Sequence, residues 1–327
     1  MEFLARLLGR RGAPLMGLDI GASGVRLAEL GAGPTGGWTL ERLGTEPLQR
    51  GWVSEGQIED FDAVVAAVRR VVARSGTRQR RVALALPASA VMTRRLVLPA
   101  GLREDELEQL IRLEAEQHIP FPLDEVSLDF NVVGPVDGSG GQVQVFVAAA
   151  RQERVQDRQG VAEAAGLVPA VMDIDAHAAQ RALRHWLAGR ALSAPGALLA
   201  WFDLEAGSLR LKVLQDGATL HEQEQAVEPT DAAADMADAQ AARRIAQALQ
   251  QFFASAPHHA VDHVLLSGPG ASSPGLARRV ADLTGFGAVR VDPFEGMAAA
   301  RAAGELLARE SSACLVACGL AMRGDST

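Results

Sequence analysis

A strand that ends in an aspartate, followed by a turn of small residues and a second strand, occurs twice in this chain of 327 residues. The first copy covers residues 15–30 and contains Asp19, and the second covers residues 197–214 and contains Asp203. One hydrophobic core serves at most ~250–300 residues, so a pattern that recurs half a chain later indicates a second core. The repeat therefore predicts two lobes, each of which begins with the same hairpin.

Strands and helices alternate along the rest of the chain, as is typical of an α/β protein. The helices predicted from apolar periodicity are 60–74, 104–118, 154–165, 176–187, 241–255, 274–283 and 311–322. The strands predicted outside the repeat are 38–43, 81–86, 91–98, 126–133, 142–149, 167–173 and 263–266. Residues from about 90 to 150 form a strand, a helix and two strands, which we interpret as a small unit inserted into the first lobe.

Composition narrows the class of protein. Hydrophobic residues make up 48% and charged residues 22%, the balance of an ordered chain, and the net charge of -8 argues against nucleic acid as a partner. Cys314 and Cys318 are the two cysteines, and their one-turn spacing suits a buried helix face in a reducing compartment. His258, His259 and His263 are better explained by a solvated loop than by a metal site. No apolar run approaches the ~18–20 residues of a membrane span and no signal core is recognisable, so we expect a cytoplasmic protein.

Three loops rich in small residues are candidate phosphate-binding loops. The candidate residues are Asp19, Gly21, Ala22 and Ser23 in the first loop, Asp203 and Gly207 in the second, and Gly268 and Gly270 in the third. Small residues let backbone N–H groups approach phosphate oxygens, and an aspartate at a strand end can hold Mg²⁺ through water. An ordinary strand end or turn explains any one loop, whereas the three together favour a nucleotide cleft.

Residues 114–130 carry the most specific motif of the chain, Glu-Ala-Glu-Gln-His-Ile-Pro-Phe-Pro-Leu-Asp-Glu-Val-Ser-Leu-Asp-Phe. Here the chain resembles the type IV pilus assembly PilM family, whose matching stretch has the same Glu-Ala-Glu, Ile-Pro-Phe/Tyr-Pro and Asp-Phe elements. The resemblance extends over nearly the whole chain. Further matching segments are 17–21, 87–91, 147–151, 165–167, 292–294 and 317–323.

This resemblance implies an actin-like (RNase H-like) fold close to that of the cell-division protein FtsA. On this basis we expect a tail at 1–13, a first lobe at 14–190 with an inserted α+β subdomain at about 90–152, and a second lobe at 191–327 whose C-terminal helix returns to the first. The family further implies ATP and Mg²⁺ as ligands, with Asp19 facing the metal through water. It also implies a scaffold at the inner membrane that binds the cytoplasmic tail of PilN and other pilus platform proteins, with a homo-oligomer as a further expectation.

Two departures from the family pattern lie in the second lobe. Glu205 stands where the family has a glycine in the second phosphate loop. No glycine lies between Gly217 and Gly268, where the family has a turn and a helical hairpin over the nucleoside. In place of the hairpin we predict an acidic loop over residues 222–238. The prediction is a degenerate nucleotide site with weak or absent hydrolysis.

Two other functions remain open from the sequence. The first is an ATPase or phosphotransferase of the actin-like superfamily that uses Asp19 to hold the metal, and the second is an FtsA-like filament former. Asp173 or Asp175 could position a water molecule for attack on a phosphate. Asp175 directly precedes the helix predicted at 176–187, however, and this position favours a helix cap.

Overall fold

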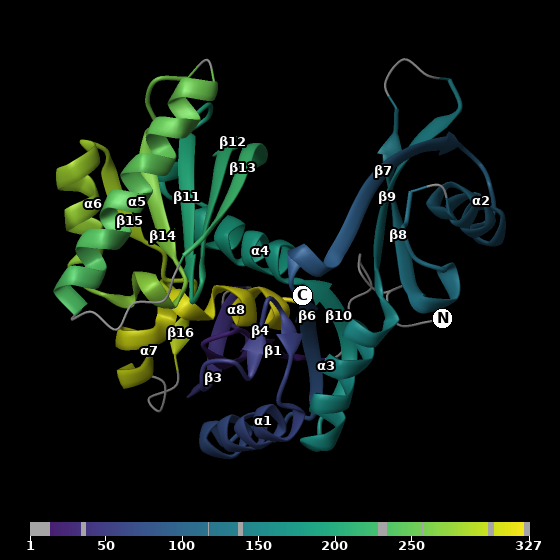
Figure 1. Ribbon diagram of the computed structural model, residues 1–327, viewed down its shortest axis with the longest axis horizontal. Coiled ribbons are helices and arrows are strands. Elements are labelled where there is room, and N and C mark those ends of the chain that lie inside the picture. The colour runs from purple at the N-terminus through teal and green to yellow at the C-terminus, as the bar shows by residue number, and fades with distance from the viewer. Residues whose placement is uncertain are drawn as a thin grey trace.

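The computed structural model describes residues 14–33, 37–116, 118–136, 140–227, 234–256, 258–299 and 304–323. Among them, a six-stranded sheet in the order β10-β6-β1-β2-β3-β16 is the centre of the first lobe (Figure 1). Its strands are β1 (Met16–Ile20), β2 (Gly24–Ala32), β3 (Trp38–Pro47), β6 (Arg81–Leu86), β10 (Val168–Ile174) and β16 (Ala298–Ala299). The first three form an antiparallel meander, and β6 runs parallel to both β1 and β10. Every residue of β1 is buried, because helices cover both faces of this sheet.

Four helices flank the first sheet (Figure 1). They are α1 (Phe61–Ser75) and α3 (Gln152–Ala164) on one face, and α4 (Asp175–Leu187) and α8 (Leu315–Ala321) on the other. α1 begins where the Asp60 carboxylate accepts the Ala63 N–H at 3.0 Å, and it ends at Gly76, which is left-handed with φ of 66°. Its apolar stripe, which includes Val64 and Val68, packs on the sheet as the periodicity predicts.

The second lobe is built on a five-stranded sheet in the order β13-β12-β11-β14-β15. Its strands are β11 (Leu198–Glu205), β12 (Ser208–Gln215), β13 (Ala218–Ala226), β14 (His263–Ser267) and β15 (Gly287–Arg290). Two helices, α5 (Ala234–Ser255) and α6 (Leu276–Thr284), pack on one face through a core that includes Phe202, Ile245 and Val280. Residues of α4 cover the other face, so α4 is shared by the two lobes.

The acidic loop expected over residues 222–238 is wrong for the described part of that segment. β13 pairs antiparallel with β12 through residue 226, and α5 begins at residue 234. Glu222 lies opposite Lys212 and Glu224 opposite Arg210 in the ladder, with ion-pair distances of 3.0 and 3.6 Å. The strand was missed because its charges have partners on the neighbouring strand, which composition alone does not reveal.

The inserted subdomain is a three-stranded sheet with one helix, and it projects away from the first sheet at the right of Figure 1. Its strands, in the order β7-β9-β8, are β7 (Val91–Pro99), β9 (Gln142–Arg151) and β8 (Val126–Pro135), and α2 (Glu104–Glu116) covers one face. On the opposite face Phe146 and His177 of α4 have ring centroids 5.6 Å apart. This contact, with Ala148 and Ala176 beside it, anchors the subdomain on the first lobe.

The two lobes share one layer formed by α4 and α8. Gly319 of α8 lies so close to α4 that an added Cβ would collide with the carbonyl oxygen of Ala178, which explains why a glycine stands there. Cys314 and Cys318 are buried in the same layer. The predicted helix 311–322 is a short 3₁₀ turn, η6 (Ser311–Cys314), followed by α8.

Short elements complete the described chain. They are β4 (Val53–Ser54), β5 (Gln57–Ile58), α7 (Gly304–Glu310), η1 (Ala88–Ala90), η2 (Leu123–Glu125), η3 (Ala191–Ser193) and η4 (Pro269–Ser272). A search of the described residues finds no helix with the length and apolar character that crossing a membrane requires.

Candidate nucleotide cleft and partner groove

The two repeated hairpins carry the same cross-strand pair of charged residues. In the β1–β2 ladder Asp19 lies opposite Arg26, and in the β11–β12 ladder Asp203 lies opposite Arg210. The Arg26 Nη1 atom is 3.4 Å from Asp19 Oδ2, and the Arg210 Nη1 atom is 3.9 Å from Asp203 Oδ2. Burial raises the pKa of Asp19, and the charges of Arg26 and Arg158 oppose that shift. Both arginines escaped the sequence analysis, although the shared spacing of seven residues after each aspartate would have revealed them.

Two polar groups of the first candidate loop are hydrogen-bonded, the Ser23 hydroxyl and the Gly21 N–H. Arg26 Nη2 donates to Ser23 Oγ at 2.7 Å, and the Gly21 N–H donates to the Gly24 carbonyl oxygen at 3.0 Å. A Cβ added to Gly21 would lie 3.0 Å from Arg26 Nη1. The guanidinium group of Arg26 therefore lies over the turn that contains Gly21, Ala22 and Ser23.

The second candidate loop is shorter than the first. Glu205 is still paired with Ser208 in the ladder, so the connection is only Ala206 and Gly207, and Gly207 has φ of 103°. The Glu205 side chain reaches the first lobe, with Oε2 3.9 Å from the Cβ position of Gly21. Burial raises the pKa of Glu205 to about 8; the charge of Arg26 opposes this shift and the neighbouring aspartates add to it.

Packing accounts for the glycines of the third loop. A Cβ on Gly268 would lie 2.5 Å from the Leu204 carbonyl oxygen, and a Cβ on Gly270 would lie 2.8 Å from the Leu204 Cβ. The Gly268 N–H donates to the Ser312 carbonyl oxygen at 2.9 Å. This loop is thus held between the end of β11 and η6.

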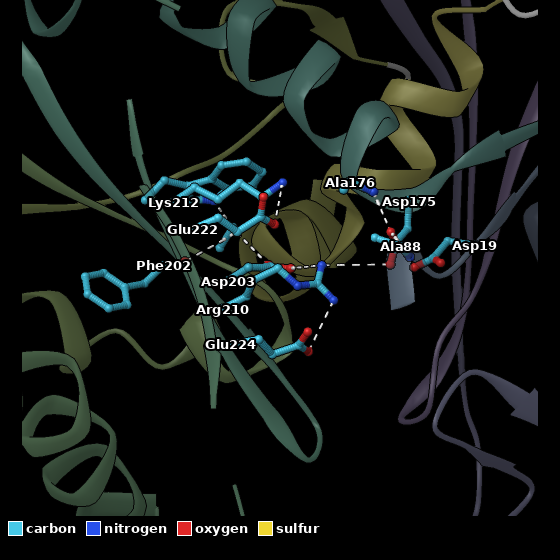
Figure 2. Close-up of polar contacts among 12 residues, drawn as sticks. Asp19, Ala88, Asp175, Ala176, Phe202, Asp203, Arg210, Lys212, Glu222 and Glu224 are labelled. Carbon is cyan, nitrogen blue, oxygen red and sulfur yellow. Dashed lines mark hydrogen bonds and ion pairs between the residues drawn. The ribbon is translucent and has the colours of Figure 1, made fainter. Parts of the chain in front are cut away.

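Arg210 also connects the lobes (Figure 2). Its Nη1 atom is 3.8 Å from Asp175 Oδ2 on the first lobe, and its Nη2 atom is 3.6 Å from Glu224 on β13. Asp175 is the first residue of α4, and its Oδ1 atom accepts the N–H groups of Ala176 at 2.5 Å and Ala88 at 2.8 Å. Asp175 therefore stabilises the start of the helix and faces the cleft at the same time.

The remaining acids of this region also have partners. Asp173 is buried, and its Oδ2 atom lies 3.0 Å from Arg181 Nη2. Asp203 Oδ1 accepts a hydrogen bond from Ser267 Oγ at 2.7 Å. Among the described residues no group of three or more His, Cys, Asp and Glu side chains is arranged to hold a metal ion. With Arg26 and Glu205 filling the space between the two turns, the cleft as it stands does not fit the phosphates of a nucleotide.

A groove of a different kind lies in the inserted subdomain. It has a volume of about 320 Å³ and runs between β7, α2 and β9. Its apolar lining includes Met92, Leu96, Ile111, Ala115, Ile119 and Val147, and its polar lining comprises Thr93, Arg94, Glu114 and His118. The sequence led us to expect a bound PilN tail through the family resemblance but left the partner-binding residues unknown, because these residues come from separate elements.

Two lobes with matching hairpins around a cleft, and a small subdomain inserted in the first lobe, define an actin-like fold. Among solved structures, the chain matches the PilM–PilN type IV pilus biogenesis complex with a TM-score of 0.73 and 28% identity, over 96% of this chain and 99% of that one. It also matches the ethanolamine utilization protein EutJ from Carboxydothermus hydrogenoformans, with a TM-score of 0.53 and 11% identity over 99% and 95% of the two chains, a likeness of fold alone. The family described as type IV pilus assembly protein PilM matches residues 17–239 and 235–325. The chain belongs to this family, which confirms the resemblance seen in the sequence.

Proposed function

We propose that this chain is a cytoplasmic scaffold of the type IV pilus assembly platform and that it binds the cytoplasmic amino-terminal tail of PilN. The observation that carries the proposal is the match to the PilM–PilN complex at 28% identity over 96% of this chain. The role needs a surface for an extended peptide and requires no chemical step, which agrees with a cleft whose acids are already paired.

The groove along β7 is the surface that we propose for the tail. β7 lies at an edge of its three-stranded sheet, where an added strand can pair with its backbone. A tail in this position would place alternate side chains against Leu96, Ile111 and Val147. Arg94 and Glu114 are polar groups of the same lining that could fix its register.

Calorimetry with a synthetic PilN tail peptide tests the proposal. Met92→Asp places a charge in the apolar lining, and an unpaired charge of this kind costs roughly 3 kcal/mol, so the affinity should fall about 100-fold. Val97→Asp is the matched control, since Val97 lies on the same strand but is 50% exposed and does not line the groove. The proposal fails if the unaltered chain does not bind the peptide, or if the two variants lose affinity equally.

The wider setting follows from the same role. We propose a position peripheral to the inner membrane through PilN, with other pilus platform proteins as further partners and a homo-oligomer as one form of the chain. We also propose the lobe limits 14–190 and 191–327, with the inserted subdomain at about 90–152. Co-purification from membranes with and without PilN tests the membrane position.

The interlobe cleft is the place where the family resemblance puts ATP with Mg²⁺, and we propose that it is a degenerate nucleotide site in this chain. The matching strand ends at Asp19 and Asp203 favour it, and Asp19 is the acid that would face the metal through water. The other residues proposed to line this site are Gly21, Ala22, Ser23, Gly207, Gly268 and Gly270. Because Arg26 and Glu205 take up the space for phosphates, we assign no ATPase or phosphotransferase step to these residues.

A further inference from the structure

One of the differences between the two hairpins changes the size of a side chain that faces the cleft. Aligned on their aspartates, the first reads Asp-Ile-Gly-Ala from Asp19 and the second reads Asp-Leu-Glu-Ala from Asp203. Their ladders place an arginine opposite each aspartate, so the alignment holds in space as well as in sequence. Gly21 of the first hairpin thus corresponds to Glu205 of the second. The second hairpin therefore has a side chain at the position where the first has none.

The Glu205 side chain lies between the two turns. One of its carboxyl oxygens is 3.9 Å from the Cβ position of Gly21, and Arg26 Nη1 is 3.0 Å from the same point. Arg26 is in turn held by Ser23 and Asp19. Each lobe therefore contributes one side chain to the space in which an anion would meet the first turn.

A phosphate bound at such a turn needs to lie within about 3 Å of backbone or side-chain donors. The Arg26 guanidinium is a suitable donor on the first lobe and the Arg210 guanidinium is one on the second. Glu205 lies near the first of these donors, beside the turn that contains Gly21, and it is half-buried. Removal of one side chain would free volume and leave both cations in place.

We propose that Glu205, together with Arg26, closes this cleft to nucleotides by occupying the volume that a phosphate would take. Loss of the Glu205 side chain would then free the Arg26 guanidinium to donate to a phosphate of ATP with Mg²⁺. The phosphates would then lie between Arg26 and Arg210. The lobes are connected by Arg210 and Asp175 and by the shared helices α4 and α8.

In this proposal the volume of the side chain, rather than its charge, excludes the phosphate. Burial raises the pKa of Glu205 to about 8, which reduces the charge that the side chain carries at pH 7. Glutamine has nearly the same size and no charge. Glu205→Gln should therefore exclude nucleotide as the unaltered chain does, whereas Glu205→Gly, which restores the residue of the first hairpin, should not.

The test is to titrate the full chain and its variants with ATP and Mg²⁺ at pH 7 and to measure the affinities by calorimetry. Glu205→Gly should bind at least about tenfold more tightly than the unaltered chain, and Glu205→Gln should stay within about threefold of it. Adding Arg26→Met to Glu205→Gly should remove the gain. The proposal is overturned if the unaltered chain binds as tightly as Glu205→Gly, if Glu205→Gly shows no gain, or if Glu205→Gln gains as much.

Two controls keep the result decisive. Thermal unfolding establishes that each variant is folded, and Glu205→Ala replaces Glu205→Gly if the added flexibility unfolds the turn. The PilN tail peptide is titrated against the same proteins, because its proposed groove is formed by other elements. If neither the unaltered chain nor any variant binds the peptide, the scaffold proposal is refuted. The ATP titration then still decides the proposal that Glu205 excludes nucleotides.

Discussion

The residues that line the cleft between the lobes differ from those that line the groove of the inserted subdomain. The charged groups of the cleft are paired with one another, whereas the apolar side chains of the groove are partly uncovered. In the cleft, Asp19, Asp175 and Asp203 each have a partner, and Arg210 extends from one lobe to the other. In the groove, Met92 and Leu96 present apolar surface that remains partly exposed. Paired charges gain little from a new ligand, whereas exposed apolar surface gains free energy when a partner covers it. The contrast teaches that the subdomain is the better place for a protein partner.

The largest effect is expected from a substitution in the layer that α4 and α8 form beneath the cleft. Gly319→Ala would push a Cβ into the Ala178 carbonyl oxygen, where backbone would have to move. We expect a loss of about 3 kcal/mol or more in the free energy of unfolding, measured by denaturant titration, because overpacking against backbone cannot be relieved by a rotamer change.

Gly304→Ala is the matched control for this substitution. Gly304 opens α7, and a Cβ added there meets no atom of the described residues within 4 Å. Its stability should change by less than about 1 kcal/mol, in the direction of stabilisation. Equal effects at the two glycines would contradict the close contact between α4 and α8.

A buried carboxyl group in the inserted subdomain predicts how the stability of the chain depends on pH. Asp129 of β8 is 7% exposed, and its Oδ2 atom has no hydrogen-bond partner among the described residues. Burial raises its pKa from 3.8 to about 6, against an opposing hydrogen bond from the Phe130 backbone and the charge of Arg323. Ionisation is therefore harder in the folded chain than in the unfolded one.

The sign of the effect follows from this difference. Below pH 3.8 both states are protonated and the group contributes nothing; above about pH 6 both are ionised and the folded state bears the full penalty. The stability of Asp129→Asn relative to the unaltered chain should thus rise by about 2–3 kcal/mol between pH 4 and pH 8. Asp124→Asn, at an exposed position of η2, is the matched control. A flat difference for Asp129→Asn would mean that this carboxylate is solvated.

The smallest expected effect concerns the arginine that connects the lobes. Arg210→Met removes a guanidinium that is 15% exposed and lies 3.6–3.9 Å from three carboxylates, so we expect a loss of roughly 1–2 kcal/mol in unfolding free energy. Arg278→Met breaks a pair on α6 that is 88% exposed on the arginine side, and it should cost less than about 0.5 kcal/mol. Equal losses would show that the cross-lobe contact contributes no more than a surface pair.

Sequence reasoning performed unevenly across these two regions. The strands that contain Asp19 and Asp203 were predicted because an apolar run before a small-residue turn is a local signal. β13 was missed because the charges of Glu222 and Glu224 are neutralised by residues of β12, which periodicity within one strand cannot show. A partner was expected only through the family resemblance, and its groove was not located, because β7, α2 and β9 contribute the lining from separate stretches of chain.

By itself, the sequence determined the α/β class, the repeat of the two hairpins, the inserted unit and the family, because each of these rests on patterns among near neighbours in the chain. Only the tertiary structure decided that Glu205 lies over Gly21, that Arg210 meets Asp175 and that Met92 opens on a groove. Such contacts join residues far apart in the chain. Their distances depend on how helices and sheets pack, and local periodicity carries no information about that geometry.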